Sequence, residues 1–402
     1  MKQKTKQTKS REIPEEWDLK PIGEIAKLKK EIVNPKKIGK YPYLGLEHIE
    51  EGTLRINSVG SSENIISNKF KFSKGDVLFG KLRPYFRKVY SPNFDGICST
   101  DIWVIIPCKD INNKFLFYFF ADKRIIDETI CSSEGTRMPR AKWDYLSKLK
   151  YFIPNINEQE KIAKILSSLD NKIELNNKLN ATLEAIGQLI FKKWFIEDRK
   201  DEWKKAKLGD YVESISGCSY TSKGLTPSEN TLVTLKSVGV DGFKQDGFKE
   251  YTGEYKEKHL VQDGDIVVAH TDLTQNRIIL GKPVIVRDFG KYKKMIASMD
   301  LSIVKPIKLI NKPYLFYLLN SESFHGHAQG YANGTTVIHL SRRAIPEFPF
   351  LIPDKELLEK FKLISENLFN QIKTNDLQNN KLSRIRDLIL PKLMNGEIRV
   401  SI

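Results

Sequence analysis

The chain has 402 residues, of which 40% are hydrophobic and 29% charged, a balance typical of a globular protein with more than one domain and not of a disordered chain. Its 66 basic and 50 acidic residues give a net charge of +16 and a pI of about 9.4. This excess favours a polyanionic partner, nucleic acid before a membrane; the plainer alternative is a basic protein without such a partner.

The chain starts with a lysine-rich stretch, residues 1–13, that lacks the apolar run of a signal peptide. We expect a basic, disordered arm here, with at most a weak phosphate-binding role. Nowhere does an apolar run reach the roughly 20 residues of a transmembrane helix. The four cysteines have no CxxC spacing and no duplicated pattern, so a zinc site or a repeated disulfide is not expected. These features predict a protein of the reducing cytoplasm that has no membrane partner.

An internal repeat dominates the rest of the sequence. Trp17 recurs as Trp203, 186 residues later, and residues 46–49 and 75–78 recur with an offset of 189. From Ser99 onward the offset is 199, and it carries the run 115–118 and the Gly-Thr pair at 135–136 onto their second copies. An offset that grows in steps indicates two copies of one fold that differ by loop insertions.

Each copy begins with a mixed segment, residues 14–154 and residues 201–353. Short β-type runs in these segments are bounded by Gly, Asn, Asp and Pro, which predicts strands. Apolar stretches at 114–121 and 313–320 predict short helices. We expect two similar α+β domains with irregular, loop-rich sheets.

Each copy ends in a long helical segment, residues 155–200 and residues 354–402. Apolar residues recur there in alternating steps of four and three, the pattern of a coiled-coil seam. Four seam positions are asparagines, which would fix the register of paired helices: Asn176, Asn180, Asn375 and Asn379. We expect Asp354 to cap the second helix and Pro391 to kink or end it.

The predicted fold is therefore α+β: two similar mixed α/β domains separated by two long helices that pack as an antiparallel coiled coil, with a pseudo-two-fold internal repeat. A helix of 37 residues would span roughly 55 Å at about 1.5 Å per residue. The alternative is two amphipathic helices that each cover their own domain and leave the asparagines exposed.

Motifs for catalysis are missing. The sequence has no GxxxxGK[ST] phosphate loop, no Asn/Asp-Pro-Pro-Tyr/Phe tetrapeptide of DNA amino-methyltransferases, and no GxGxxG after a strand. His325 and His327 form a lone HxH pair without further ligands, so we expect no metal site. The acidic and lysine residues of 254–258 resemble part of a metal-dependent nuclease centre, but the first copy has no counterpart. We therefore expect no catalytic residue.

Two loops of each copy carry residues suited to DNA. Loop 80–88, which follows a predicted strand, contains basic and aromatic residues, and its counterpart 270–277 is polar. Lys and Arg side chains bind phosphates, Arg also reads guanine, and Gln and Asn read adenine. A second loop follows each Gly-Thr pair. Variable solvated loops, or turns that merely start a strand, are the alternatives. The candidate DNA-binding residues are Lys81, Arg83, Arg87, Lys88, Thr136, Arg137, Arg140, Lys236, Thr271, Gln275, Asn276, Arg277, Thr335, Thr336 and His339.

The order of domain, long helix, domain, long helix resembles the specificity subunit of type I restriction–modification systems. The similarity rests on the strand phrase 72–78, the Gly-Thr turn, and the run Ile153-Pro154…Glu158-Gln159-Glu160-Lys161-Ile162 that leads into Leu169–Ile173. The second copy departs from this pattern at residues 357–361, which read Leu-Leu-Glu-Lys-Phe.

The resemblance implies that each mixed domain is a target recognition domain that reads one half of a bipartite site in double-stranded DNA. It implies that the helices space the halves and dock two methyltransferase (modification) subunits, and that restriction (motor-nuclease) subunits join them. S-adenosylmethionine, ATP and Mg²⁺ would belong to those partners, so the chain itself would be non-catalytic and need no cofactor. A self-contained metal-dependent nuclease with tandem DNA-recognition domains is the alternative, and a helical scaffold that does not bind nucleic acid is a third.

Overall fold

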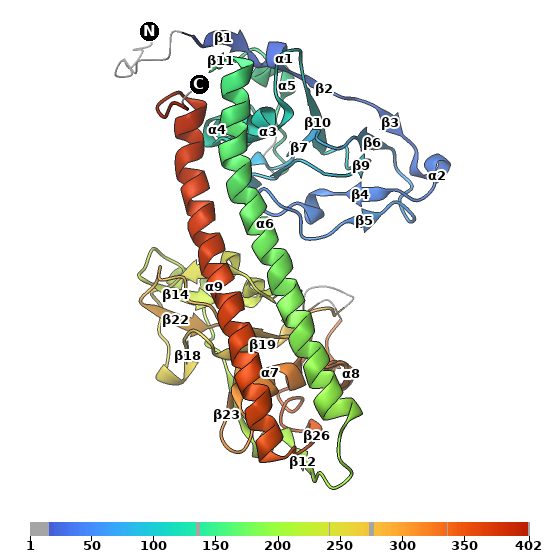
Figure 1. Cartoon of the computed structure of the whole chain (residues 1–402), viewed down its shortest axis with the longest axis vertical. Coiled ribbons are helices and arrows are strands. Elements are labelled where there is room, and N and C mark those ends of the chain that lie inside the picture. Colours follow the sequence, from blue (N-terminus) through green and yellow to red (C-terminus); the bar gives the residue numbers. More distant parts are fainter. Residues whose placement is uncertain (1–15, 134–136, 241, 273–276, 336, 401–402) are drawn as a thin grey trace. The chain divides into compact units, whose positions relative to one another are not determined.

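A computed structural model describes residues 16–133, 137–240, 242–272, 277–335 and 337–400. Its contacts divide the chain into two compact units, one of Met1–Glu174 with Lys381–Ile402 and the other of Leu175–Asn380. Each of the two long helices, α6 (Ile156–Lys192) and α9 (Lys355–Met394), contributes one part to each unit (Figure 1). The predicted arm, residues 1–13, lies outside the described residues.

The first unit contains a four-stranded sheet of order β2-β10-β7-β8, a five-stranded sheet of order β3-β6-β9-β4-β5, and the pair β1-β11. Its strands are β1 (Asp18–Pro21), β2 (Ala26–Leu28), β3 (Ile32–Val33), β4 (Pro42–Leu44), β5 (Gly60–Ser61), β6 (Lys69–Phe72), β7 (Val77–Gly80), β8 (Val89–Tyr90), β9 (Gly96–Cys98), β10 (Ile102–Pro107) and β11 (Lys150–Ile153). Its shorter helices are α1 (Ile22–Ile25), α2 (Pro35–Ile38), α3 (Asn113–Ala121), α4 (Lys123–Cys131) and α5 (Trp143–Leu146).

The second unit contains sheets of order β13-β23-β19-β21 and β17-β14-β22-β18, a three-stranded sheet β20-β25-β24, and the pairs β12-β26 and β15-β16. Its strands are β12 (Lys205–Lys207), β13 (Val212–Ser216), β14 (Asn230–Val233), β15 (Val238–Gly239), β16 (Gly242–Phe243), β17 (Phe248–Glu250), β18 (Leu260–Val261), β19 (Ile266–Ala269), β20 (Thr271–Asp272), β21 (Pro283–Ile285), β22 (Lys294–Ala297), β23 (Leu301–Pro306), β24 (Ala332–Asn333), β25 (Ile338–Leu340) and β26 (Pro349–Leu351). Its shorter helices are α7 (Lys312–Leu319) and α8 (Glu322–Gly330).

The sequence repeat is also a repeat of structure. The sheet β2-β10-β7-β8 matches β13-β23-β19-β21 strand for strand, and in both the central strands pair antiparallel. The second sheet of each unit contains one parallel pair, β4 with β9 and β14 with β22. The predicted short helices are confirmed as α3 and α7, which lie 199 residues apart.

The sequences of the central strands β7 and β19 are continuously apolar because each strand packs against one hydrophobic core on one face and a second core on the other. In β7, Val77 and Phe79 pack with α3, whereas Leu78 packs with Leu44 and Phe72 of the second sheet. The same alternation occurs in β19 of the second unit. Residues with a period of two thus fill both cores, as expected for a strand buried on both faces.

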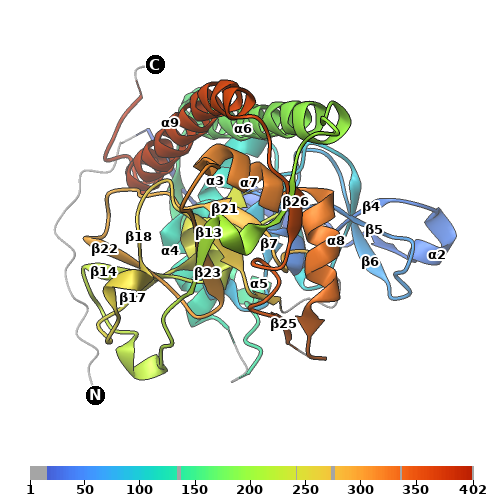
Figure 2. The same cartoon turned by 90° about the horizontal axis from the view of Figure 1, so that it is seen from below.

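A helix separates the sheet from the long helices in the second unit. Tyr314 and Tyr317 of α7 pack in one core with Phe191 of α6, Phe361 of α9 and Val304 of β23. Figure 2 shows α7 between the long helices and β13 and β21. This arrangement ties the sheet to both long helices through aromatic contacts.

The long helices begin and end at identifiable residues. Asn155 precedes α6, and its side-chain oxygen accepts a hydrogen bond of 3.1 Å from the backbone N–H of Glu158. Pro391 does not end α9, which continues to Met394; the buried side chains of Leu390 and Leu393 hold this last turn in the core of the first unit. In the part of the chain that the structure describes, no helix is both long and apolar enough to cross a membrane.

Candidate nucleic-acid interface

The two candidate loops of the first unit lie side by side. Leu82 forms an isolated antiparallel bridge with Arg140. The backbone N–H of Arg83 donates to the carbonyl of Pro139 at 2.8 Å, and its Nη2 donates to the carbonyl of Arg137 at 3.3 Å. The two loops, which are about 50 residues apart in the sequence, therefore form one surface.

The corresponding loops of the second unit also pair. Thr271 of β20 lies opposite His339 of β25, and Asp272 lies opposite Ile338. Here the pairing is extended by β24 into a three-stranded sheet. The Gly-Thr pair of this unit is followed by β25, and not directly by β26, the strand that leads to Pro353.

The two units share one hydrogen-bond frame around these loops. In the first, the N–H of Lys81 donates to the carbonyl of Asp101 at 3.0 Å, and the N–H of Ala141 donates to the carbonyl of Lys81 at 2.9 Å. In the second, His270, Asp300 and Leu340 repeat both bonds at 2.7 and 2.8 Å. The sequence offsets of 189 and 199 relate each residue to its counterpart. The backbone frame is thus conserved between the copies while the side chains on it differ.

Three arginines of these loops have a left-handed backbone. Arg83 and Arg87 flank the turn η2 (Pro84–Phe86) with φ of 51° each, and Arg277 has φ of 52°. For a residue with a Cβ atom this conformation costs roughly 1–2 kcal/mol. Such strain clusters at functional sites, where the surrounding structure holds the residue in place.

Side chains of the interface are oriented by neighbours. The Nε of Arg140 donates to Oδ1 of Asp101 at 3.0 Å. In the second unit, Oγ1 of the buried Thr271 lies 3.3 Å from Nδ1 of His339. Burial, with a smaller effect of the nearby Arg342, lowers the pKa of His270 to about 4, so its imidazole is neutral at pH 7.

Not every predicted site residue joins this surface. Lys236 is exposed on η6 (Leu235–Ser237), and no hydrogen bond among the described residues joins it to the paired loops. Lys88 follows η2, and its Nζ donates to the carbonyl of Leu46 at 2.6 Å. Thr335 is exposed before β25. Four of the predicted residues lie outside the described residues: Thr136, Gln275, Asn276 and Thr336.

Two residues of the surface were not selected from the sequence. His270 is the counterpart of Lys81 at an offset of 189, so the repeat alone could have identified it. Arg342 acts on His270 electrostatically, but it comes after β25 and no local pattern distinguishes it from other exposed arginines.

The seam asparagines form a network within the second unit. Asn176, which is fully buried, donates through Nδ2 to Oδ1 of Asn379 at 2.9 Å, and Asn375 donates to Oδ1 of Asn180 at 2.7 Å. Partner numbers fall on α9 as they rise on α6, so the two helices run antiparallel here. The alternative of exposed asparagines on separate helices is wrong for this segment.

The hydrogen bonds of the network recur in pairs related by the sequence repeat, except that Asp376 stands where the other half has Asn177. Asn379 donates to Oδ1 of Asn177 at 2.8 Å, and the matching bond runs from Asn180 to Oδ1 of Asp376, also at 2.8 Å. The carboxylate of Asp376 attracts Arg287, whose Nε lies 3.4 Å away. Burial raises the pKa of Asp376, and the nearby Arg287 opposes this effect.

Polar side chains of the recognisable helix start hold α6 in the first unit. Glu158 is fully buried and accepts from Nε1 of Trp17 and from Nε of Arg399, both at 3.0 Å. Gln159 donates to the carbonyl of Pro154 at 2.8 Å. In the second unit Leu358 takes the place of this glutamine and packs in the core, so the sequence departure replaces a polar anchor with an apolar one.

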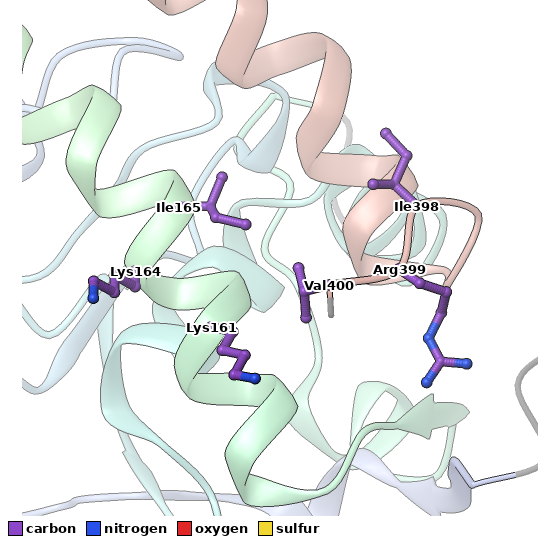
Figure 3. A pocket seen from close by; sticks show the side chains of 6 residues that line it. All are labelled: Lys161, Lys164, Ile165, Ile398, Arg399 and Val400. Atoms are coloured by element: carbon purple, nitrogen blue, oxygen red, sulfur yellow. The ribbon is translucent and has the colours of Figure 1, made fainter. Parts of the chain in front are cut away.

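A hollow of about 400 Å³ lies beside the start of α6, where the C-terminal segment folds back (Figure 3). Its lining consists of Lys161, Lys164, Ile165, Ile398, Arg399 and Val400. Arg399 is held by Glu158, and Val400 is buried in the core. The packing of the tail accounts for this hollow, which offers no built set of polar ligands.

The acidic residues that suggested a nuclease have structural contacts of their own. Within the described ranges, no group of three or more His, Cys, Asp or Glu side chains is placed to hold a metal ion. The carbonyl of Glu254 accepts from the hydroxyl of Tyr251 at 3.0 Å, so its backbone has a structural role. His327, of the HxH pair, has its Nε2 2.9 Å from the carbonyl of Ala344.

Comparison with known proteins finds similarity to type I restriction specificity subunits. A model described as the type I restriction modification DNA specificity domain matches residues 14–185. The type I restriction enzyme MjaIX specificity subunit of Methanocaldococcus jannaschii is 27% identical over 98% of this chain and 96% of its own length. The HindI specificity subunit of Haemophilus influenzae is 26% identical over 82% of this chain and 88% of its own length.

One solved structure shares the fold. The S subunit of a type I restriction-modification system from M. genitalium aligns over 96% of this chain and 98% of its own length, with a TM-score of 0.53 and 17% identity. The match of the family model and the two specificity subunits confirm the resemblance inferred from the sequence, and the solved structure adds that the fold is shared. They give the alternative of a self-contained nuclease no support.

Proposed function

We propose that this chain is the DNA-recognition subunit of a type I restriction–modification complex and catalyses no reaction itself, because residues 14–185 match the type I restriction modification DNA specificity domain. Residues 14–154 and 201–353 are its two target recognition domains. Each reads one half of a bipartite site in double-stranded DNA. The methyl transfer and the cleavage are carried out by partner subunits, which bind the cofactors.

The shared backbone frame of the paired loops carries this proposal. The same hydrogen bonds hold position 81 and position 270, yet the side chains are a lysine in one unit and a neutral histidine in the other. One scaffold with two different reading surfaces is suited to two different half-sites. The strained arginines and the net charge of +16 supply the positive field that phosphates require.

The helical segments 155–200 and 354–402 act as the spacer between the half-sites and as an antiparallel coiled coil. The asparagine network supports a fixed register, because a buried amide loses its partners when the helices slip. A register fixed in this way would give the spacer between the half-sites a defined length.

The helices also offer a surface for partner subunits. Leu175, Leu179, Ile186 and Leu189 recur on one face of α6 in the second unit and are 40–65% exposed. Exposed apolar side chains in a stripe are typical of a protein–protein interface. We assign this face to a methyltransferase subunit; the complex would contain two such subunits and would be joined by restriction subunits.

Binding of duplex DNA by the purified chain tests this proposal. We expect an affinity that falls steeply with salt, because each neutralised phosphate contributes about −0.9 to the slope of log affinity against log salt concentration. Incubation with DNA, Mg²⁺ and S-adenosylmethionine should leave the DNA uncut and unmethylated until partner subunits are added. Cleavage by the chain alone, abolished by a chelator, would instead support a nuclease, and no DNA binding by the assembled complex would support a helical scaffold.

A further inference from the structure

One outward-facing position recurs in both paired loops. Arg140 lies before the buried Ala141, and its counterpart His339 lies between the buried Ile338 and Leu340. Successive side chains of an extended segment point to opposite faces, so the buried neighbours direct residues 140 and 339 outward. Both positions are also fixed by backbone pairing, to Leu82 and Thr271 respectively.

In the first unit the outward side chain is Arg140, which an ion pair holds in one orientation. Its Nε donates to Asp101 at 3.0 Å, and this ion pair is partly exposed, with 47% of the Arg140 side chain accessible. Among the described residues the two terminal nitrogens of Arg140 have no hydrogen-bond partner. A guanidinium held through Nε presents its terminal N–H groups as a fork, which matches O6 and N7 of guanine in the major groove.

In the second unit the outward side chain is His339, and one nitrogen of its imidazole already has a hydrogen-bond partner. Nδ1 of His339 faces Oγ1 of Thr271 at 3.3 Å, which fixes the ring and leaves Nε2 to face outward. No partner of Nε2 is found within the described ranges. A single nitrogen makes one hydrogen bond to a base edge, where the arginine fork makes two. Position 339 therefore discriminates between bases less strongly than position 140.

We propose that residues 140 and 339 are the equivalent base-reading positions of the two domains. Arg140 reads a guanine in one half-site with Asp101 as its positioning residue. His339 reads one base of the other half-site through Nε2, with Thr271 as its positioning residue. This inference rests on the proposed function, and it adds which side chain of each domain reads a base edge and what chemistry it uses.

Neighbouring cations have a different role in this account. Arg83 and Arg87 flank η2, close in sequence to the Leu82–Arg140 bridge, and Nζ of Lys88 donates to the carbonyl of Leu46. Contacts of such residues to phosphates position the DNA without reading sequence. Their removal is expected to weaken binding to all sequences alike, which separates them from Arg140.

The test begins with the bipartite motif methylated when the chain and its methyltransferase subunits are produced together in a heterologous host. Duplexes that contain this motif, and single-base variants of each half, are then used as binding probes for the assembled complex. Arg140→Gln should reduce the preference for a guanine in one half-site by roughly 5- to 150-fold, without changing the preferences in the other half. Arg140→Lys should restore part of the preference, because lysine also donates to guanine but without the fork.

A gain of function gives a second, independent test. His339→Arg places an arginine at the position equivalent to Arg140, in the unit where Asp300 is the counterpart of Asp101. Thr271→Leu recreates the apolar neighbour that Leu82 provides. We expect the double variant to prefer guanine at one position of the half-site read by the second domain. A folding defect could not produce a new preference of this kind.

Lys148→Gln is the matched control, because it removes one exposed positive charge of the same unit away from the paired loops. It should leave every base preference unchanged. Equal base preferences for Arg140→Gln and for the unaltered chain would overturn the inference while leaving the proposed function intact. Failure of the unaltered complex to bind or methylate any bipartite sequence would instead overturn the proposed function.

Discussion

Glu158 provides a stringent test of how the first unit holds its long helix. Its carboxylate is fully buried and accepts from Nε1 of Trp17 and Nε of Arg399, each at 3.0 Å. The second copy has Leu357 at the matching position, so Glu158→Leu introduces a residue that this scaffold tolerates elsewhere. The side chain remains large, so a cavity does not explain the result.

The magnitude follows from the two donors that lose their acceptor. Trp17 is 4% exposed, so its N–H becomes buried without a partner, at a cost of about 1–3 kcal/mol. The side chain of Arg399 is 42% exposed and returns to water, which adds less than about 1 kcal/mol. We expect Glu158→Leu to lower the free energy of unfolding of the first unit by about 2 kcal/mol. Glu158→Gln should cost less, because its amide oxygen still accepts from Trp17.

Hydrogen exchange resolves the effect to one unit. A loss of about 2 kcal/mol corresponds to a roughly 30-fold faster exchange of the first-unit amides that open together. Amides of residues 18–25 and 396–400 should exchange faster, whereas those of residues 205–216 in the second unit should not. Glu160→Gln, an exposed change two positions away, is the control. If the first-unit amides of the Glu158→Leu variant exchange at the same rates as those of the Glu160→Gln variant, Glu158 does not anchor the helix.

Three further predictions concern the second unit. Burial lowers the pKa of His270 to about 4, so below pH 6.5 this imidazole takes up a proton in the unfolded chain but stays neutral in the folded one. The free energy of unfolding should therefore fall between pH 6.5 and pH 5, and less so in His270→Gln; parallel urea titration curves for the two proteins would contradict this. A Cβ on Gly187 would lie 1.9 Å from the hydroxyl oxygen of Tyr317, so Gly187→Ala should cost about 1–3 kcal/mol in thermal melts, whereas Gly326→Ala, with no atom within 4 Å, should not destabilise. Asn176→Ala removes two hydrogen bonds and should lower the urea midpoint by the equivalent of about 2 kcal/mol. An unchanged midpoint would show that the asparagine network does not stabilise the helix pair.

The features that sequence predicts well here are those with a period or a repeat. Steps of four and three located the long helices and placed Asn176 and Asn375 in the seam, because a helix face returns at a fixed spacing. The offsets of 189 and 199 located both pairs of candidate loops. They also show that Lys81 and His270 occupy one position of a shared frame.

The features that sequence misses depend on residues far apart in the chain. Glu158 is bonded to Trp17 and Arg399, 141 and 241 positions away, and no local pattern marks such partners. The bridge between Leu82 and Arg140 was missed for the same reason. Pro391 was expected to kink or end α9 near its C-terminus; it does not end the helix, which continues to Met394 with Leu390 and Leu393 buried.

The most direct test of the central claim is the methylated motif before and after a domain replacement. Residues 14–154 are exchanged for the corresponding segment of a type I specificity subunit with a different target, and the methylome of a host that carries the complex is sequenced. The account predicts that one half of the bipartite motif changes, while the other half and the spacer length stay the same. A motif that is unchanged, or one in which both halves change, would contradict the assignment of one half-site to each domain.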